Sequence, residues 1–135
     1  MAGNSFVGRG TLELFISNAN ASPIYEQIAQ QIKSAILQGE LVEGAILPSI
    51  RSLANDLHVS VITTKRTYAE LEASGLVTTV QGKGTFVAGG NFELLKEERL
   101  RSIEEQLARA IEEARGAGIT RADLHDMIDL LMEDR

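Results

Sequence analysis

Apolar residues recur along the chain with two different spacings, and each spacing predicts a different kind of element. From Thr11 to Ser17, Leu12, Leu14 and Ile16 occupy every second position. This period of two is typical of a half-buried β-strand, so we expect a strand over residues 11–17. After Asn18 the period changes to three and four, which is typical of amphipathic helices.

Three helices are predicted between Pro23 and Val87. Serines stand before each of them, and we expect Ser22, Ser49 and Ser60 to act as N-caps, because a serine hydroxyl accepts from the free amides of a first turn. Proline in the first turn has no N–H to leave unpaired. The predicted inward positions are Ile24, Ile28, Ile32, Ala35 and Ile36 in the first helix, Leu53, Ala54 and Leu57 in the second, and Thr64, Thr67, Tyr68 and Leu71 in the third.

The third helix has a second face with a different character. A rotation of 100° per residue places Ile62, Lys65, Arg66 and Ala69 opposite the inward side. Two cations, an exposed isoleucine and a small alanine would fit a DNA groove. An ordinary solvated helix face is the alternative interpretation of the same residues.

A glycine-bounded hairpin follows the third helix. Leu76 to Val80 and Thr85 to Val87 read as strands, and Gln81-Gly82-Lys83-Gly84 reads as their turn. Three helices followed by such a hairpin are the layout of a winged helix-turn-helix. We therefore expect the chain to read DNA, with Tyr68 and Phe86 in the core and not serving as stacking platforms.

A helical tail is expected beyond the hairpin. Apolar residues repeat from Leu100 until Gly116-Ala117-Gly118, and Thr120 with Asp123 resembles a capping box that starts a last short helix. Such a helical hairpin cannot bury both of its apolar stripes alone, so we expect it to pair with a second copy. The predicted dimerisation residues are Leu100, Ile103, Leu107, Ile111, Leu124, Met127, Ile128 and Leu131.

These patterns predict a mostly α fold with a small β-hairpin wing, extended by a two-helix dimerisation hairpin. The predicted organisation is a flexible N-terminus without function over residues 1–10, a winged helix-turn-helix over 11–87, a linker over 88–91 and the tail over 92–135. Asn91 is a candidate cap for the tail.

Composition narrows the function. The 135 residues are 44% hydrophobic and 24% charged, which is typical of a globular protein. The absence of cysteine excludes disulfides and thiolate catalysis. His125 and Asp129 could share a metal, but two ligands without a third favour a solvated pair. We expect no metal, no cofactor and no enzyme activity, and a cytoplasmic location without membrane contact, since no apolar run is long enough to span a bilayer.

The net charge of −6 needs an explanation in a protein expected to bind phosphates. The acidic excess lies in the tail: residues 88–135 carry −5, and residues 23–87 carry only −1. Within 23–87 the cations Arg51, Lys65, Arg66 and Lys83 fall in the helix-turn-helix and wing. The distribution is therefore compatible with a DNA interface.

Several motifs in a fixed order resemble one family. Leu47-Pro-Ser-Ile-Arg-Ser-Leu-Ala54, Val59-Ser-Val-Ile-Thr-Thr-Lys-Arg-Thr-Tyr68, Glu70-Leu-Glu-Ala-Ser-Gly-Leu76 and Gln81-Gly-Lys-Gly-Thr-Phe-Val87 resemble the DNA-binding domain of GntR-family bacterial transcription regulators. The opening Pro23-Ile-Tyr-Glu-Gln-Ile28 and the short helical tail look like its YtrA subfamily. The resemblance implies a homodimeric DNA-binding regulator, usually a repressor.

The resemblance also implies where DNA is contacted. By position, the family's contacts fall on Arg51, on the third helix from Ser60 through Ile62, Thr63 and Lys65 to Arg66, and on Gly82, Lys83 and Gly84. Val61 departs from the arginine of many members, and His58 replaces a common glycine in the turn. Histidine tolerates a left-handed backbone better than most residues do.

Two questions stay open from the sequence. A winged-helix protein-interaction module without DNA binding is the alternative function, favoured by the acidic total. A small-molecule effector is the other unknown, because about 45 residues after the linker are too few for a separate sensory domain. Any effector would sit between helices or at the dimer seam.

Overall fold

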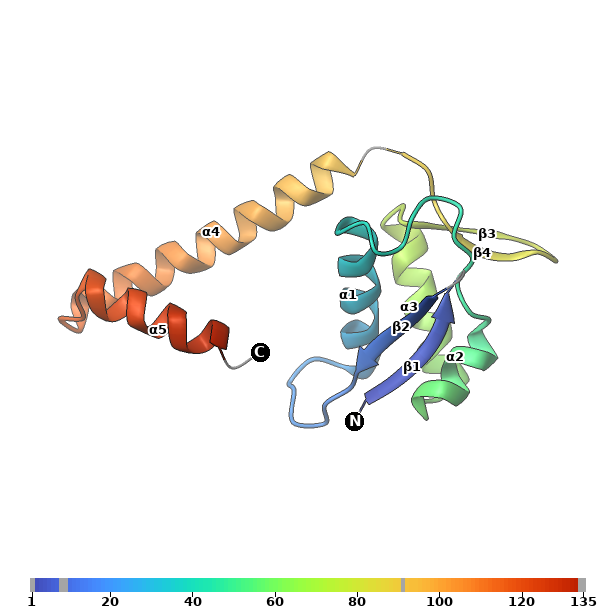
Figure 1. The fold of residues 1–135 in the computed structure, drawn as a ribbon, viewed down its shortest axis with the longest axis horizontal. Coiled ribbons are helices and arrows are strands. Elements are labelled where there is room, and N and C mark those ends of the chain that lie inside the picture. The colour runs from blue at the N-terminus through green and yellow to red at the C-terminus, as the bar shows by residue number, and fades with distance from the viewer. Residues whose placement is uncertain (1, 8–9, 91, 134–135) are drawn as a thin grey trace. The chain divides into compact units, whose positions relative to one another are not determined.

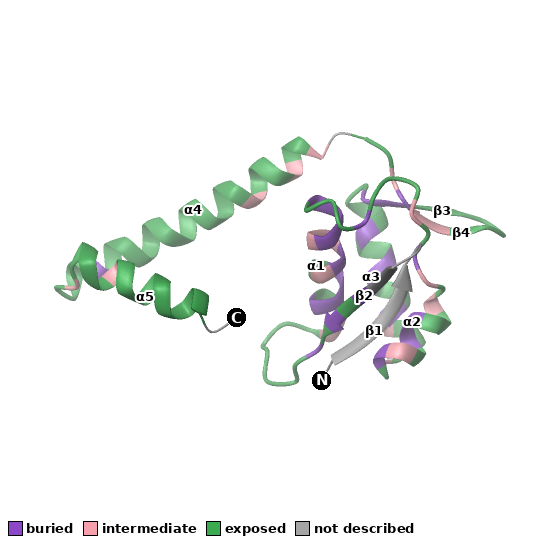
Figure 2. Ribbon diagram, viewed as in Figure 1, coloured by how far each residue is buried: buried purple, intermediate pink, exposed green. Residues whose placement is uncertain are grey.

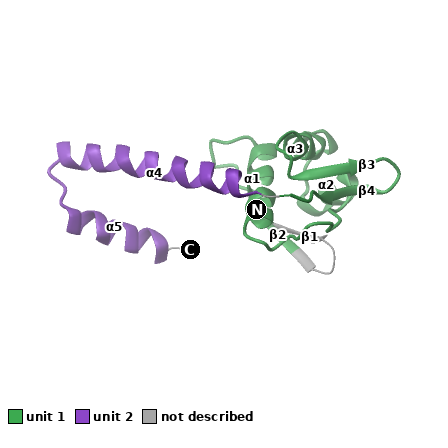
Figure 3. Ribbon diagram, turned by 90° about the horizontal axis from the view of Figure 1, so that it is seen from above, with its two compact units in different colours: residues 1–91 green, residues 92–135 purple. Residues whose placement is uncertain are grey.

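The computed structural model describes residues 2–7, 10–90 and 92–133, and the chain divides into two compact units (Figure 1). The first comprises residues 1–91 and the second residues 92–135 (Figure 3). The expected cap at Asn91 lies outside the described residues.

The first unit opens with a β-hairpin. Strand β1 (Ala2–Val7) pairs antiparallel with β2 (Gly10–Phe15), with Ala2 opposite Phe15. Burial of Leu12, Leu14 and Ile16 confirms the alternation predicted from the sequence. The sequence shows no periodicity over residues 1–10, yet the structure has strand β1 there. This strand is held by backbone hydrogen bonds with β2, which leave no side-chain period in the sequence.

Helix α1 (Ile24–Leu37) carries the predicted apolar stripe, with Ile28 and Ile32 buried. The predicted Ser22 cap is wrong, because the N-cap position is occupied by Pro23 and no side chain caps the helix. The helix begins one residue later than expected. The Ser22 carbonyl instead accepts a hydrogen bond from the Gln27 side chain.

Two glutamines of α1 hold the hairpin against the helix. The Gln31 amide accepts from the Phe15 backbone N–H at 2.8 Å and donates to the Phe15 carbonyl at 2.6 Å. Gln27 repeats this pattern with both backbone groups of Ser17, each at 3.0 Å. These side chains satisfy the backbone groups that end β2, as a neighbouring strand would.

The turn between α2 (Ile50–Leu57) and α3 (Val61–Ala73) agrees with the sequence. The predicted caps are confirmed, since the Ser49 and Ser60 hydroxyls accept from backbone N–H groups three residues later. His58 ends α2 at φ 57° and ψ 43°, a left-handed conformation. That geometry lets the chain reverse within a few residues before α3 begins.

The wing is a hairpin of β3 (Val77–Val80) and β4 (Gly84–Val87), paired antiparallel. The segment before α2 adds to it, because Ile46 bridges Phe86 and the Leu47 N–H donates to the Thr85 carbonyl at 2.8 Å. The sequence did not indicate this third pairing. It fastens the wing to the chain that leads into α2.

The core of the first unit lies between the inward faces of α1, α2 and α3 (Figure 2). Tyr68 is buried there as expected, whereas Phe86 is only half-buried. The largest fully buried aliphatic side chains are Leu14, Ile28, Ile32, Leu53, Leu57, Leu71 and Leu76. This packing holds α3 in a fixed position against α1 and α2.

The second unit consists of α4 (Glu93–Gly116) and α5 (Arg121–Glu133). The predicted capping box is confirmed: the Thr120 N–H donates to Asp123 at 2.9 Å, and the Asp123 N–H donates to the Thr120 hydroxyl at 3.2 Å. These bonds lower the pKa of Asp123. Helix α4 begins earlier than the apolar repeat from Leu100 suggested. Within the described part of the chain, no helix has the length and apolar character needed to cross a membrane.

Candidate nucleic-acid interface

The outward face of α3 presents the residues that the sequence places there. Ile62 is 81% exposed, and Lys65, Arg66 and Ala69 are exposed as well. On the opposite side Thr64 and Thr67 are fully buried. An isoleucine exposed at the start of this helix is suited to an apolar contact in a groove.

The first turn of α3 is ordered by a hydroxyl pair. Ser60 accepts from the Thr63 N–H at 3.0 Å and donates its own proton to the Thr63 hydroxyl oxygen at 2.8 Å. The remaining amides of this turn have no intrahelical acceptor. Together with the positive end of the helix dipole, they favour an anion such as a phosphate at this position.

Arg66 is stacked on an aromatic ring of a different helix. Its guanidinium carbon lies 3.9 Å from the centroid of the Tyr25 ring, in the first turn of α1. The side chain nevertheless remains exposed. Stacking occupies a face of the guanidinium and leaves its in-plane N–H groups able to donate.

Hydrogen bonds from buried side chains fix α3 against its neighbours. The Thr67 hydroxyl donates to the Tyr25 carbonyl at 3.1 Å, and the Tyr68 hydroxyl donates to the Pro48 carbonyl at 2.6 Å. Burial raises the pKa of Tyr68, so its hydroxyl stays protonated and remains a donor. Both contacts link α3 to the chain segments that begin α1 and α2.

The tip of the wing depends on two glycines. Gly82 has φ +79° and Gly84 has φ +125°, conformations that a residue with a Cβ rarely adopts. A Cβ on Gly84 would also meet the Ile46 side chain at 3.3 Å. Lys83 lies between them and is exposed, and its backbone N–H donates to the Val80 carbonyl at 2.9 Å.

A polar chain of contacts braces the wing against α3. The Thr79 hydroxyl donates to the Glu72 carboxylate at 3.0 Å, and the Thr79 and Thr85 hydroxyls share a hydrogen bond of 3.1 Å across the hairpin. Helix and wing are thus connected by side chains as well as by the backbone.

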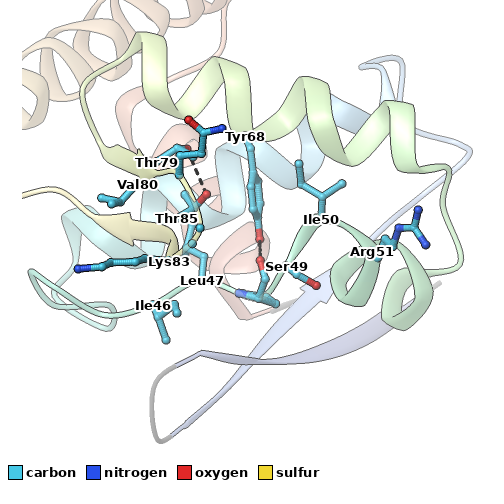
Figure 4. Close-up of a pocket in the computed structure, with 14 residues that line it drawn as sticks. Ile46, Leu47, Ser49, Ile50, Arg51, Tyr68, Thr79, Val80, Lys83 and Thr85 are labelled. Carbon is cyan, nitrogen blue, oxygen red and sulfur yellow. Dashed lines mark hydrogen bonds between the residues drawn. The ribbon is translucent and has the colours of Figure 1, made fainter.

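A groove of about 510 Å³ runs between the wing and the start of α2 (Figure 4). Arg51 lines it from α2, Lys83 lines it from the wing, and the Tyr68 ring forms part of its floor. Ser49, which caps α2, also lines it. The charged groups of Lys83 and Arg51 lie at opposite ends of the groove and point outward from it (Figure 4), where a phosphate backbone passing across both ends would meet them.

The structure brings together most of the predicted interface residues and adds one contact that the sequence did not indicate. Arg51, Lys83, Gly82 and Gly84 line one groove, and Ile62, Lys65 and Arg66 share the exposed face of α3. That contact is the stack of Arg66 on Tyr25. No periodicity within a single helix could have indicated its contact with Arg66, because the contact joins two helices.

The predicted dimerisation residues occupy the second unit as exposed apolar side chains. Exposure ranges from 40% at Ile111 to 69% at Leu131, and Leu124 is half-buried. The others in this range are Leu100, Ile103, Leu107, Met127 and Ile128.

Comparison with known proteins connects this geometry to a family. Residues 24–87 match the gntR family of bacterial regulatory proteins. This range covers α1 to β4, the elements that build the face and the groove described above. The HTH-type transcriptional repressor YtrA of Bacillus subtilis (strain 168) is 36% identical over 119 residues, which are 88% of this chain and 92% of the relative.

Solved structures agree with the sequence match. A transcriptional antiterminator from Listeria monocytogenes EGD-e is 33% identical, with a TM-score of 0.67 over 90% of each chain. The DNA-binding domain of AraR in complex with operator ORX1 is 32% identical, with a TM-score of 0.51 over 57% of this chain and 96% of that one. The chain therefore belongs to the GntR family of bacterial regulatory proteins, as a YtrA-like transcription regulator whose first unit is a DNA-binding winged helix-turn-helix.

Proposed function

We propose that the protein binds a two-fold symmetric operator as a homodimer and represses transcription. The observation that carries this proposal is the exposed cationic face of α3 beside a groove lined by Arg51 and Lys83. The repressor name of the YtrA relative supports the direction of control.

Bases are read by the outward residues of α3. A recognition helix lies in the major groove with its N-terminal part near the base edges. Arg66 is suited to a bidentate contact with guanine, Lys65 to a base or phosphate, and Ile62 to the methyl group of thymine. These contacts supply the sequence preference.

Phosphates are held by the residues around α3. Arg51 and Lys83 contact the backbone on either side of the groove, and the first turn of α3 contributes Ser60, Thr63 and free amides. Gly82 and Gly84 allow the wing backbone to approach a groove wall without a Cβ. These contacts set position and carry little sequence information.

The tail joins two copies. In the single chain, seven of the eight predicted dimerisation side chains remain between 40% and 69% exposed, and the eighth, Leu124, is half-buried. Exposed apolar residues of this density mark an interface, and a second copy offers an identical row to cover them. A dimer has two winged helix-turn-helix units, so its operator should contain two half-sites.

Binding to a duplex from the region upstream of the protein's own gene tests the proposal. We expect a gel shift at low salt, with log affinity falling against log salt at a slope of roughly −5 to −9 if each dimer makes about six to ten phosphate contacts. Failure to retain any duplex at low salt would contradict it. Light scattering of the free protein tests the dimer separately, since a single-chain mass would contradict that part alone.

A further inference from the structure

We infer that Tyr25 is a positioning residue for base recognition: its ring holds the Arg66 guanidinium in the orientation in which Arg66 reads the operator. The inference deepens the proposed function and rests on the proposed contact between Arg66 and a base. It assigns a role in specificity to α1, a helix whose buried side chains pack in the core and whose Gln31 binds Phe15 at the end of β2.

The geometry of the pair supports this role. A distance of 3.9 Å between the guanidinium carbon and the ring centroid places the cation directly against the ring. Among the described residues, the Arg66 guanidinium has no hydrogen-bond or ion-pair partner. Its in-plane donors are therefore uncommitted, while the ring restrains its orientation.

The backbone that carries the Tyr25 ring is held against α3. The Thr67 hydroxyl, next to Arg66 in α3, shares its one proton between the Tyr25 carbonyl and the Thr63 carbonyl, each at 3.1 Å. Thr67 is fully buried and Tyr25 is half-buried, so the joint between α1 and α3 is shielded from water. The stacked pair is therefore next to a buried hydrogen bond that joins α1 and α3.

The stack would lower the entropy that the Arg66 side chain loses when it binds DNA. A free arginine side chain samples many rotamers and loses that freedom when it binds. Restraining the guanidinium before DNA arrives lowers this cost for a contact that depends on orientation. Because the bidentate contact of Arg66 with a base occurs only in the specific complex, removal of the ring should reduce specific binding and leave non-specific binding nearly unchanged.

The Tyr25 side chain can be removed without breaking the joint. Thr67 bonds to the backbone carbonyl of residue 25, which every substitution retains. Tyr25→Leu keeps an apolar side chain and removes the ring, and Tyr25→Phe keeps the ring and removes only the hydroxyl. The pair therefore separates stacking from packing and from any hydroxyl contact with DNA.

The experiment is a double-mutant cycle on full-length protein. Wild type, Tyr25→Leu, Tyr25→Phe, Arg66→Ala and the Tyr25→Leu/Arg66→Ala double variant are titrated by fluorescence anisotropy. One probe is the consensus duplex that the wild type selects from random DNA, and the other is poly(dI-dC) as non-specific duplex. Thermal unfolding by circular dichroism verifies that each variant is folded.

We expect Tyr25→Leu to weaken binding to the selected duplex about 3- to 10-fold, with less than a 2-fold change on poly(dI-dC). Tyr25→Phe should stay within about 2-fold of wild type, and Tyr25→Leu should have no further effect once Arg66 is alanine. Equal losses in both Arg66 backgrounds, or tighter binding by Tyr25→Leu, would overturn the inference. If Arg66→Ala itself has no effect on the selected duplex, the proposed base contact fails, which is a distinguishable result.

Discussion

The hydroxyl of Tyr68 in α3 donates a 2.6 Å hydrogen bond to the carbonyl oxygen of Pro48, one residue before the Ser49 cap of α2. The bond joins the middle of the recognition helix to the start of the preceding helix. Arg51 stands in the first turn of α2 and Arg66 in the second turn of α3. Their relative position therefore depends on this buried contact.

Replacing Tyr68 with phenylalanine tests the energetic weight of that bond. Tyr68→Phe preserves the ring in the core but leaves the Pro48 carbonyl without its donor, which should lower the free energy of unfolding by about 1–2 kcal/mol. Urea denaturation followed by circular dichroism measures the change. An unfolding midpoint equal to that of the wild type would show that the bond contributes nothing.

The same residue predicts a loss of stability at alkaline pH. Burial raises the pKa of Tyr68 in the folded protein above the value near 10 of an unfolded tyrosine. The folded state consequently retains the proton longer, so this contribution is complete below pH about 10 and is lost as pH rises toward the folded pKa. Stability of the wild type should fall more steeply with pH in that window than stability of Tyr68→Phe. Parallel curves would contradict the assignment.

Arg66 and Lys83 are expected to differ in what they contribute to DNA binding. Arg66→Ala should cost about 1–3 kcal/mol on the preferred sequence and relax the preference at one base pair of each half-site. Lys83→Ala should weaken all duplexes similarly and reduce the salt slope, because a phosphate contact is blind to sequence. Titrations of both variants against matched and mutated duplexes measure the difference. Uniform weakening by Arg66→Ala would remove it from the base-reading group.

The proposed role of the tail in dimerisation can be tested separately. Leu107 is 47% exposed on the apolar stripe of α4, and Leu107→Asp would place a charge in the proposed seam. We expect light scattering to give a single-chain mass for this variant. Ser102→Asp adds the same charge to α4 away from the stripe and should leave the dimer intact. Dimerisation of both variants alike would show that the seam lies elsewhere.

Local signals account for what the sequence predicted well. Ser49, Ser60 and the Thr120–Asp123 box were predictable because a cap involves only residues within one turn. The inward and outward faces of α3 followed from helical rotation alone. The family motifs then added the DNA-binding role, which periodicity cannot supply.

Contacts between distant segments explain what was missed. Strand β1 exists because β2 pairs with it, and the bridge from Ile46 to Phe86 joins the wing to the chain before α2. The stack of Arg66 on Tyr25 depends on how α1 and α3 cross. At Ser22 the error was local, because Pro23 occupies the cap position itself.

Selection of bound sites from random duplex DNA tests the central claim most directly. The account predicts an enriched sequence with two inverted half-sites, at a spacing that lets both DNA-binding units of one dimer bind at once. Footprinting should show that the dimer protects both half-sites from cleavage. The account also predicts that the same selection with Arg66→Ala loses preference at one symmetry-related base pair in each half. Recovery of no sequence preference, or of a single half-site bound by one chain, would contradict the claim.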